Sequence, residues 1–130
     1  MARIVIIDDD EAMLSFLQRF LSSEGHEVHS ATDGKEGAEL ALRVDADLVI
    51  TDLWMPTTEG LETVRRVKQL VPKSRIVMMS GRPVLGKVSF FYIAKLTGAD
   101  ATIQKPFTGE EMIVLVHDLL STGGESVETR

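Results

Sequence analysis

The sequence predicts an α/β fold: a single doubly wound (βα)5 domain built on a parallel five-stranded sheet. Short apolar runs rich in β-branched residues alternate along the chain with amphipathic segments of helical period. This alternation is typical of parallel strands with helices packed on both faces. A length of 130 residues suits one domain, and 44% hydrophobic with 26% charged residues is an ordinary globular balance.

The first strand, helix and second strand follow directly from the N-terminal pattern. Ile4–Ile7 is a β-branched run followed directly by acids, which indicates a buried strand. Apolar residues at helical spacing then form one face of a first helix: Met13, Phe16, Leu17, Phe20 and Leu21. Gly25 suits the C-terminal cap of that helix, and residues 26–31 form a weaker, partly polar strand.

The middle of the chain repeats this unit. The stretch 33–36 resembles a capping box that opens a second helix, and Leu48–Ile50 is a third strand that ends at Asp52. A third helix carries its apolar residues at Leu61, Val64, Val67 and Val71. Ile76–Met79 is the fourth strand, and we expect a fourth helix within residues 85–97.

The last unit completes the domain. Residues 101–104 alternate like an edge strand, and Thr108–Glu111 resembles a capping box that opens a fifth helix. We therefore assign residues 1–121 to the domain and residues 122–130 to a flexible tail or the start of a linker. Strands one, three and four are unbroken apolar runs, which indicates burial on both faces. The more polar strands two and five belong at the edges, which gives the flavodoxin-like order 2-1-3-4-5 and a ligand site beyond the carboxyl ends of the strands.

Composition excludes several classes of function. The net charge of -6 disfavours nucleic acid and anionic membrane surfaces as partners of this domain. The absence of cysteine excludes disulfides, thiolate metal sites and thiol nucleophiles. No apolar run approaches the length of a membrane span, and the sequence shows no signal peptide, so we expect a cytoplasmic protein.

The carboxyl ends of the predicted strands carry the residues with chemistry. Asp8 and Asp9 follow the first strand, Asp52 the third, Ser80 the fourth and Lys105 the fifth. Neighbouring carboxylates repel one another unless a cation lies among them, and their hard oxygen ligands suit Mg²⁺ or Mn²⁺. A lysine and a hydroxyl in the same pocket suit a phosphoryl group, which a carboxylate can itself accept as an aspartyl-phosphate.

Four motifs in this order resemble a response-regulator receiver domain of two-component signalling, of the chemotaxis-receiver kind, from Arg3 to about Leu120. They are Ile-Ile-Asp8-Asp9, Asp52-Leu-Trp-Met-Pro with Gly60, Ser80-Gly, and Lys105-Pro-Phe. The resemblance implies that Asp52 accepts phosphate from a histidine kinase or phosphotransfer protein. It implies that Asp8, Asp9, Asp52 and the backbone carbonyl of Trp54 bind magnesium. It also implies that Ser80 and Lys105 pair with the phosphoryl oxygens.

The sequence departs from this family at three places. Thr102 stands where many receivers carry an aromatic switch residue three positions before the lysine. Trp54 and Arg82 flank the acceptor and the hydroxyl residue, where we expect them to shield an acyl phosphate from water. The segment from Ser80 to Lys105 is longer than is common, which predicts an extra turn or loop around residues 82–87.

The expected fourth helix is apolar nearly all round and contains Phe90, Phe91 and Tyr92. Such a helix is either deeply buried or meets a partner. In receivers this helix forms the output surface with the fifth strand and fifth helix, so a homodimer or target-protein contact is a reasonable hypothesis.

Two other functions compete with a phosphorylation switch that is not itself an enzyme. A pseudo-receiver would signal through the same fold without phosphate, and Thr102 leaves room for it. A magnesium-dependent phosphatase with an aspartate nucleophile usually carries acids two residues apart on one strand, whereas Asp52 is followed by Leu53 and Trp54.

Overall fold

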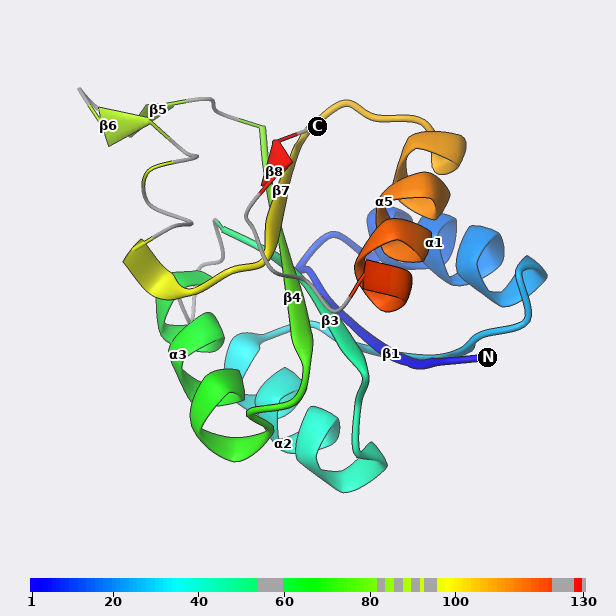
Figure 1. Cartoon of the computed structure of the whole chain (residues 1–130), viewed down its shortest axis with the longest axis horizontal. Coiled ribbons are helices and arrows are strands. Elements are labelled where there is room, and N and C mark those ends of the chain that lie inside the picture. The colour runs from blue at the N-terminus through cyan, green and yellow to red at the C-terminus, as the bar shows by residue number, and fades with distance from the viewer. Residues whose placement is uncertain are drawn as a thin grey trace.

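The computed structural model describes residues 1–53, 60–81, 84–85, 88–89, 92, 96–122 and 128–129. Its central sheet is parallel and has the order β2-β1-β3-β4-β7-β8, with a separate two-stranded antiparallel sheet formed by β5 and β6 (Figure 1). The elements along the chain are β1 (Arg3–Ile7), α1 (Glu11–Ser23), β2 (Glu27–Ala31), α2 (Gly34–Val44), β3 (Leu48–Asp52), α3 (Gly60–Leu70), β4 (Arg75–Ser80), β5 (Val84–Leu85), β6 (Val88–Ser89), β7 (Ala101–Gln104), α5 (Gly109–Thr122) and β8 (Glu128–Thr129).

The predicted strand order is confirmed. The five predicted strands correspond to β1, β2, β3, β4 and β7, and they lie in the order 2-1-3-4-5. The chain order reverses at β1, which pairs with β2 on one side and β3 on the other. The short strand β8 adds to the outer side of β7, where the sequence analysis placed only a tail.

Two apolar layers explain why the central strands read as unbroken hydrophobic runs. Ile4 and Ile6 of β1 belong to the cluster formed with α1 and α5, whereas Val5 and Ile7 belong to the cluster formed with α2 and α3. Successive side chains of a strand point to opposite faces, so helices on both faces require apolar residues at every position. Figure 1 shows α1 and α5 on one side of the sheet and α2 and α3 on the other.

Capping residues lie at the helix starts and ends that the sequence indicated. The Asp33 carboxylate accepts the Glu36 backbone N–H at 2.8 Å at the start of α2. At the start of α5, Thr108 and Glu111 form both bonds of a capping box, at 3.0 and 3.1 Å. Gly25, just past α1, has a φ of 86°, a left-handed conformation that only glycine adopts without steric cost.

A fourth helix was expected somewhere within residues 85–97, and helical residues do occur in that range, but its first part contains strand residues. Val84–Leu85 and Val88–Ser89 form the antiparallel pair β5–β6, with only two residues between the strands. The first of these two residues is a glycine, which suits a tight hairpin, and β-branched valines favour strands. The hairpin coincides with the extra segment expected around residues 82–87. Tyr92 and residues 96–97 are helical, and residues 93–95 lie outside the described residues.

Gly60 allows α3 to begin directly against the end of β3. A Cβ at this position would lie 2.5 Å from the Asp52 backbone oxygen and 2.5 Å from Leu53 Cα, and neither atom can move independently of the backbone. We therefore expect Gly60→Ala to lower the free energy of unfolding by about 1–3 kcal/mol, measured by urea denaturation. Gly81→Ala is the matched control because no atom lies within 4 Å of its Cβ. Equal stabilities of the two variants would contradict the steric explanation.

Candidate functional site

The candidate site lies at the carboxyl ends of neighbouring strands. Asp8 follows β1 directly and Asp52 is the last residue of β3. Because Ile7 pairs with Thr51 in the parallel ladder, the residue after each comes to the same edge of the sheet. Asp8, Asp9 and Asp52 can each offer a carboxylate oxygen within 4.8 Å of the others. Asp8 and Asp52 are buried, at 1% and 6% exposure, and Asp9 is exposed.

Lys105 reaches this carboxylate group from the end of β7. Its Nζ lies 3.0 Å from Asp8 Oδ2 and 3.2 Å from Asp52 Oδ1. The backbone N–H of Lys105 donates to the Ser80 carbonyl at 2.7 Å, so the β4–β7 ladder continues one step past β7 and fixes the root of the side chain. One lysine therefore bridges two acids that are 44 residues apart in the chain.

Burial dominates the electrostatics of Asp52. Desolvation raises the pKa of this carboxyl to about 6, the positive charge of Lys105 opposes that rise, and the negative charges of Asp8 and Asp9 add to it. Burial alone would lower the pKa of Lys105, but hydrogen bonds and charge from Asp8 and Asp52 outweigh burial and raise it. The lysine is therefore a permanent cation facing a carboxylate that is costly to ionise.

The donor set fits a hard divalent cation. Among the described residues, three carboxylates gather beside one ammonium group, which contacts two of them, so these groups carry an excess of negative charge when all are ionised. The Asp10 backbone N–H donates to Asp8 Oδ1 at 2.9 Å and orients that carboxylate. Asp10 itself caps α1 by accepting the Ala12 backbone N–H at 3.0 Å, so its side chain has a structural role. Oxygen ligands in excess of the local positive charge suit Mg²⁺.

The other predicted site residues divide into three groups. Ser80 ends β4 at the same edge of the sheet, and its side chain is fully buried. Thr102, in the middle of β7, is also fully buried, whereas Tyr92 is 54% exposed. Trp54, Arg82, Phe90 and Phe91 lie outside the described residues.

Two features of the site were not anticipated from the sequence. Lys105 was expected on the phosphate side of the pocket, but in the structure it also contacts Asp8, on the strand beyond β3. The close approach of Gly60 to the Asp52 carbonyl was not predicted either, because the sequence places this glycine in a motif without indicating what it contacts. The predicted strand order was the only sequence-based indication of the Lys105–Asp8 contact and of the Gly60–Asp52 approach. Strand order does not specify the direction of individual side chains.

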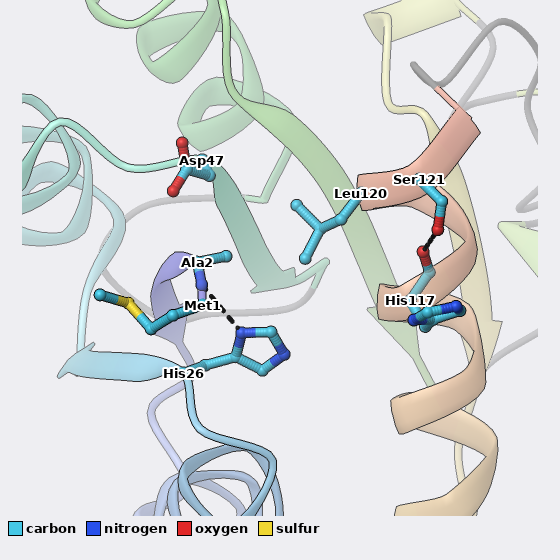
Figure 2. A pocket seen from close by; sticks show the side chains of 7 residues that line it. All are labelled: Met1, Ala2, His26, Asp47, His117, Leu120 and Ser121. Atoms are coloured by element: carbon cyan, nitrogen blue, oxygen red, sulfur yellow. Dashed lines mark hydrogen bonds between the residues drawn. The ribbon is translucent and has the colours of Figure 1, made fainter.

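A separate pocket of about 440 Å³ lies at the opposite end of the sheet (Figure 2). Its lining includes residues that precede β1, β2 and β3, namely Ala2, His26 and Asp47. His26 Nδ1 accepts the Ala2 backbone N–H at 3.0 Å, and Asp47 accepts the Arg3 backbone N–H at 2.8 Å, so both groups hold the N-terminal ends of the strands together. Burial lowers the pKa of His26. These bonds give the pocket residues a structural role.

Comparison with known proteins decides the family. The sequence matches the response regulator receiver domain over residues 4–117. The chain belongs to the response regulator receiver family. Receiver domains are regulatory switches that receive phosphoryl groups from histidine kinases and bind Mg²⁺ at an acidic pocket. In this receiver the acidic group is Asp8, Asp9 and Asp52.

The receiver resembles response regulator MprA of Mycobacterium leprae, with 34% identity over 119 residues that make up 91% of this chain and 50% of MprA. It is 33% identical to the cell cycle transcriptional regulator CtrA of Caulobacter vibrioides over 88% of this chain and 48% of CtrA. The receiver thus spans about half the length of these relatives. Among solved structures, chemotaxis response regulator CheY4 of Vibrio cholerae superposes with a TM-score of 0.82 and 26% identity, covering 92% of this chain and 98% of CheY4.

None of the helices in the described part of the receiver is long and apolar enough to cross a membrane.

Proposed function

We propose that this receiver accepts a phosphoryl group on Asp52 from a histidine kinase or phosphotransfer protein, and that phosphorylation switches an output surface. The observation that carries the proposal is the environment of Asp52. Its carboxylate is 6% exposed, lies 3.2 Å from the Lys105 ammonium and has two further acids close by. A buried nucleophile between a fixed cation and a cation-binding acidic group is suited to phosphoryl transfer.

In the proposed reaction, an Asp52 carboxylate oxygen attacks the phosphorus atom. A new O–P bond forms as the bond from phosphorus to the donor histidine nitrogen breaks, and that nitrogen keeps the electron pair. The ionised form of Asp52 is the nucleophile, so its raised pKa of about 6 still leaves it reactive at neutral pH. Lys105 needs to move only from the carboxylate oxygens to the phosphoryl oxygens that replace them.

A bound Mg²⁺ would neutralise charge on the transferred phosphoryl group, and Asp8, Asp9 and Asp52 are the residues that would hold it. Asp9 is the exposed member, so it can be replaced without leaving a buried cavity. We expect Asp9→Asn to weaken Mg²⁺ binding by at least about tenfold, measured by calorimetric titration.

Asp10→Asn is the matched control for this titration. Asp10 is the neighbouring acid and caps α1, a role that asparagine fills equally well. The control loses the same formal charge, so equal weakening in both variants would assign the effect to general electrostatics and count against the ligand role of Asp9.

The direct test of the proposed function is to add Mg²⁺ and acetyl phosphate and to follow intact mass. Fluorescence of Trp54, two residues after the acceptor, gives a second signal. A single phosphoryl adduct supports the phosphorylated switch. No adduct and no response to Mg²⁺ would favour a phosphate-independent module, and turnover of many phosphoryl groups per chain would favour a phosphatase.

The lifetime of the acyl phosphate is proposed to depend on two side chains that flank the acceptor site. Trp54 and Arg82 flank the acceptor and Ser80 in sequence, and we propose that they shield the phosphoryl group from water. Replacing both with alanine is expected to speed the loss of the adduct after the donor is removed, measured by intact mass over time. An unchanged decay rate would rule out shielding.

We further propose that Ser80 and Lys105 pair with the phosphoryl oxygens. We propose that β7, which carries Thr102 at the position of the usual aromatic switch residue, transmits the resulting change to the output face. The output face comprises the helix containing Tyr92, β7 and α5, within a receiver of residues 1–121. Tyr92 and Leu96 support this face because they are 54% and 69% exposed, as a partner-binding surface requires. A homodimer or a target protein is the partner of this face.

A further inference from the structure

Lys105 lies at the start of the turn that joins β7 to α5, and the two sides of this turn are held by the backbone. On the β7 side, the Lys105 backbone N–H donates to the Ser80 carbonyl at 2.7 Å. On the α5 side, Thr108 belongs to the capping box that starts the helix. Between them, Pro106 is exposed and has no backbone N–H to donate. The middle of the turn therefore depends on side-chain packing, and Phe107 is the hydrophobic residue there.

An aromatic row of Phe107, Phe16 and Phe20 joins this turn to α1. The ring centroids of Phe107 and Phe16 are 6.2 Å apart and their planes are tilted by 53°. Phe16 and Phe20 are 4.9 Å apart and tilted by 56°, and both geometries are favourable for aromatic pairs. A Cβ on Gly109 would overlap the Phe20 ring, so α5 also begins directly against the row. The turn is therefore packed onto α1 from both Phe107 and the first residue of α5.

The same helix carries the acids of the candidate site at its other end. Asp8 and Asp9 directly precede α1, and Asp10 is its N-cap. The Asp10 backbone N–H donates to Asp8 Oδ1 at 2.9 Å, while Asp8 Oδ2 lies 3.0 Å from Lys105 Nζ. Figure 1 shows α1 and α5 on the same side of the sheet. One helix thus follows the acids and, through Phe16, contacts the turn that bears the lysine.

We propose that Phe107 and Phe16 are positioning residues for the candidate site. Their ring contact holds the turn at the place from which the Lys105 ammonium reaches both buried acids. The lysine side chain is flexible and 22% exposed, and its Nζ lies 3.0 Å from Asp8 Oδ2 and 3.2 Å from Asp52 Oδ1. A displacement of the turn by about 1 Å would lengthen both contacts beyond hydrogen-bond distance and leave the ammonium to water. The inference rests on the proposed function for its meaning, but the contact itself requires neither phosphate nor metal.

NMR spectroscopy of the Lys105 ammonium in EDTA tests this role. An ammonium held between two carboxylates exchanges its protons slowly enough to give a nitrogen–proton signal, and its loss in Lys105→Met assigns that signal. We expect the signal to weaken on the order of fivefold in Phe107→Leu and in Phe16→Leu, which keep an apolar side chain but remove one ring of the pair. Phe107→Tyr keeps the ring and is expected to restore the signal.

Leu119→Ala is the matched control for lost packing. Leu119 is 4% exposed and belongs to the same hydrophobic cluster, but it lies near the C-terminal end of α5, away from the turn. A general loosening of the cluster would weaken the ammonium signal in this variant as well. We expect Leu119→Ala to keep the signal of the original chain.

Titration with Mg²⁺ gives a second reading with a distinctive sign. The ammonium competes with Mg²⁺ for the same carboxylates, so its withdrawal in Phe107→Leu is expected to tighten Mg²⁺ binding by at least about threefold, toward the value of Lys105→Met. A merely damaged site would bind Mg²⁺ more weakly. Leu119→Ala is expected to bind Mg²⁺ like the original chain.

Three results would overturn the positioning role. They are the absence of the signal in the original chain, its persistence in both leucine variants, and an equal loss in Leu119→Ala. Weaker Mg²⁺ binding in Phe107→Leu would also contradict it. Failure of the proposed function has a different signature, because it shows as no phosphoryl adduct on the original chain while the ammonium signal and its loss in the leucine variants remain.

Discussion

Asp52→Asn is expected to abolish the phosphoryl adduct that acetyl phosphate and Mg²⁺ produce on the original chain. Asparagine keeps the size of the side chain at this buried position but removes the anionic oxygen that attacks phosphorus. Asp8, the other buried acid of the group, does not take its place, because Asp8 is held by Lys105 and by the Asp10 backbone N–H. Intact mass before and after incubation gives the result directly.

Treatment with hydroxylamine completes this experiment. Hydroxylamine cleaves an acyl phosphate but leaves a phosphate ester of serine or threonine in place, and Thr51 and Ser80 both lie at the same edge of the sheet. An adduct that persists in Asp52→Asn and resists hydroxylamine would move the acceptor to a hydroxyl group. Asp10→Asn is expected to be phosphorylated like the original chain.

The same substitution is expected to stabilise the metal-free receiver at neutral pH. Burial raises the pKa of Asp52 from the ordinary value of 3.8 to about 6, so ionising this carboxyl in the folded chain costs free energy. A shift of this size corresponds to about 2–3 kcal/mol at pH 7, on the order of 10 °C in Tm. Asparagine carries no charge at any pH and avoids that cost. Thermal unfolding in EDTA at several pH values measures the difference.

The pH dependence of this stability difference follows from the direction in which the pKa of Asp52 is shifted. A carboxyl whose pKa is higher in the folded chain binds its proton more tightly there, so the proton favours folding. This contribution is fully present below about pH 4 and is lost as the pH rises through about 6. The advantage of Asp52→Asn over the original chain should therefore be absent near pH 4 and grow until about pH 7.

Magnesium and a neighbouring variant provide the controls. If Mg²⁺ binds the ionised acids as proposed, adding it should stabilise the original chain more than Asp52→Asn and reduce the difference in Tm between them. Asp10→Asn changes an exposed cap and should follow the original chain across the pH range. A gap that stays constant from pH 4 to pH 7 would show that the substitution acts through packing rather than through charge.

Much of the site was predictable because parallel sheets bring the carboxyl ends of their strands to one edge. Polar residues at the ends of the first, third and fourth apolar runs were enough to place Asp8, Asp52 and Ser80 together once the strand order was inferred. The strand order itself came from the contrast between doubly buried and partly polar runs. Roles of individual side chains came only from the resemblance to receivers.

Other features were not predictable from local patterns. The hairpin β5–β6 lies where only an extra turn or loop was expected, because an apolar stretch with few polar residues shows no clear periodicity that would indicate strands. The pairing of β8 with β7 joins residues 27 positions apart, Ala101 and Glu128, and nothing in a short polar tail indicates such a partner.

The sequence by itself determined the sheet order, the helix caps and the edge at which the acids meet, since these depend on residue type and on spacing between neighbours. Only the tertiary structure decided that Lys105 bridges Asp8 and Asp52, that Gly60 must lack a Cβ, and that the C-terminal segment closes the edge of β7. These three features depend on ångström-scale distances between segments far apart in the chain. Hydrophobic periodicity specifies which face of an element is buried, but it leaves such distances open.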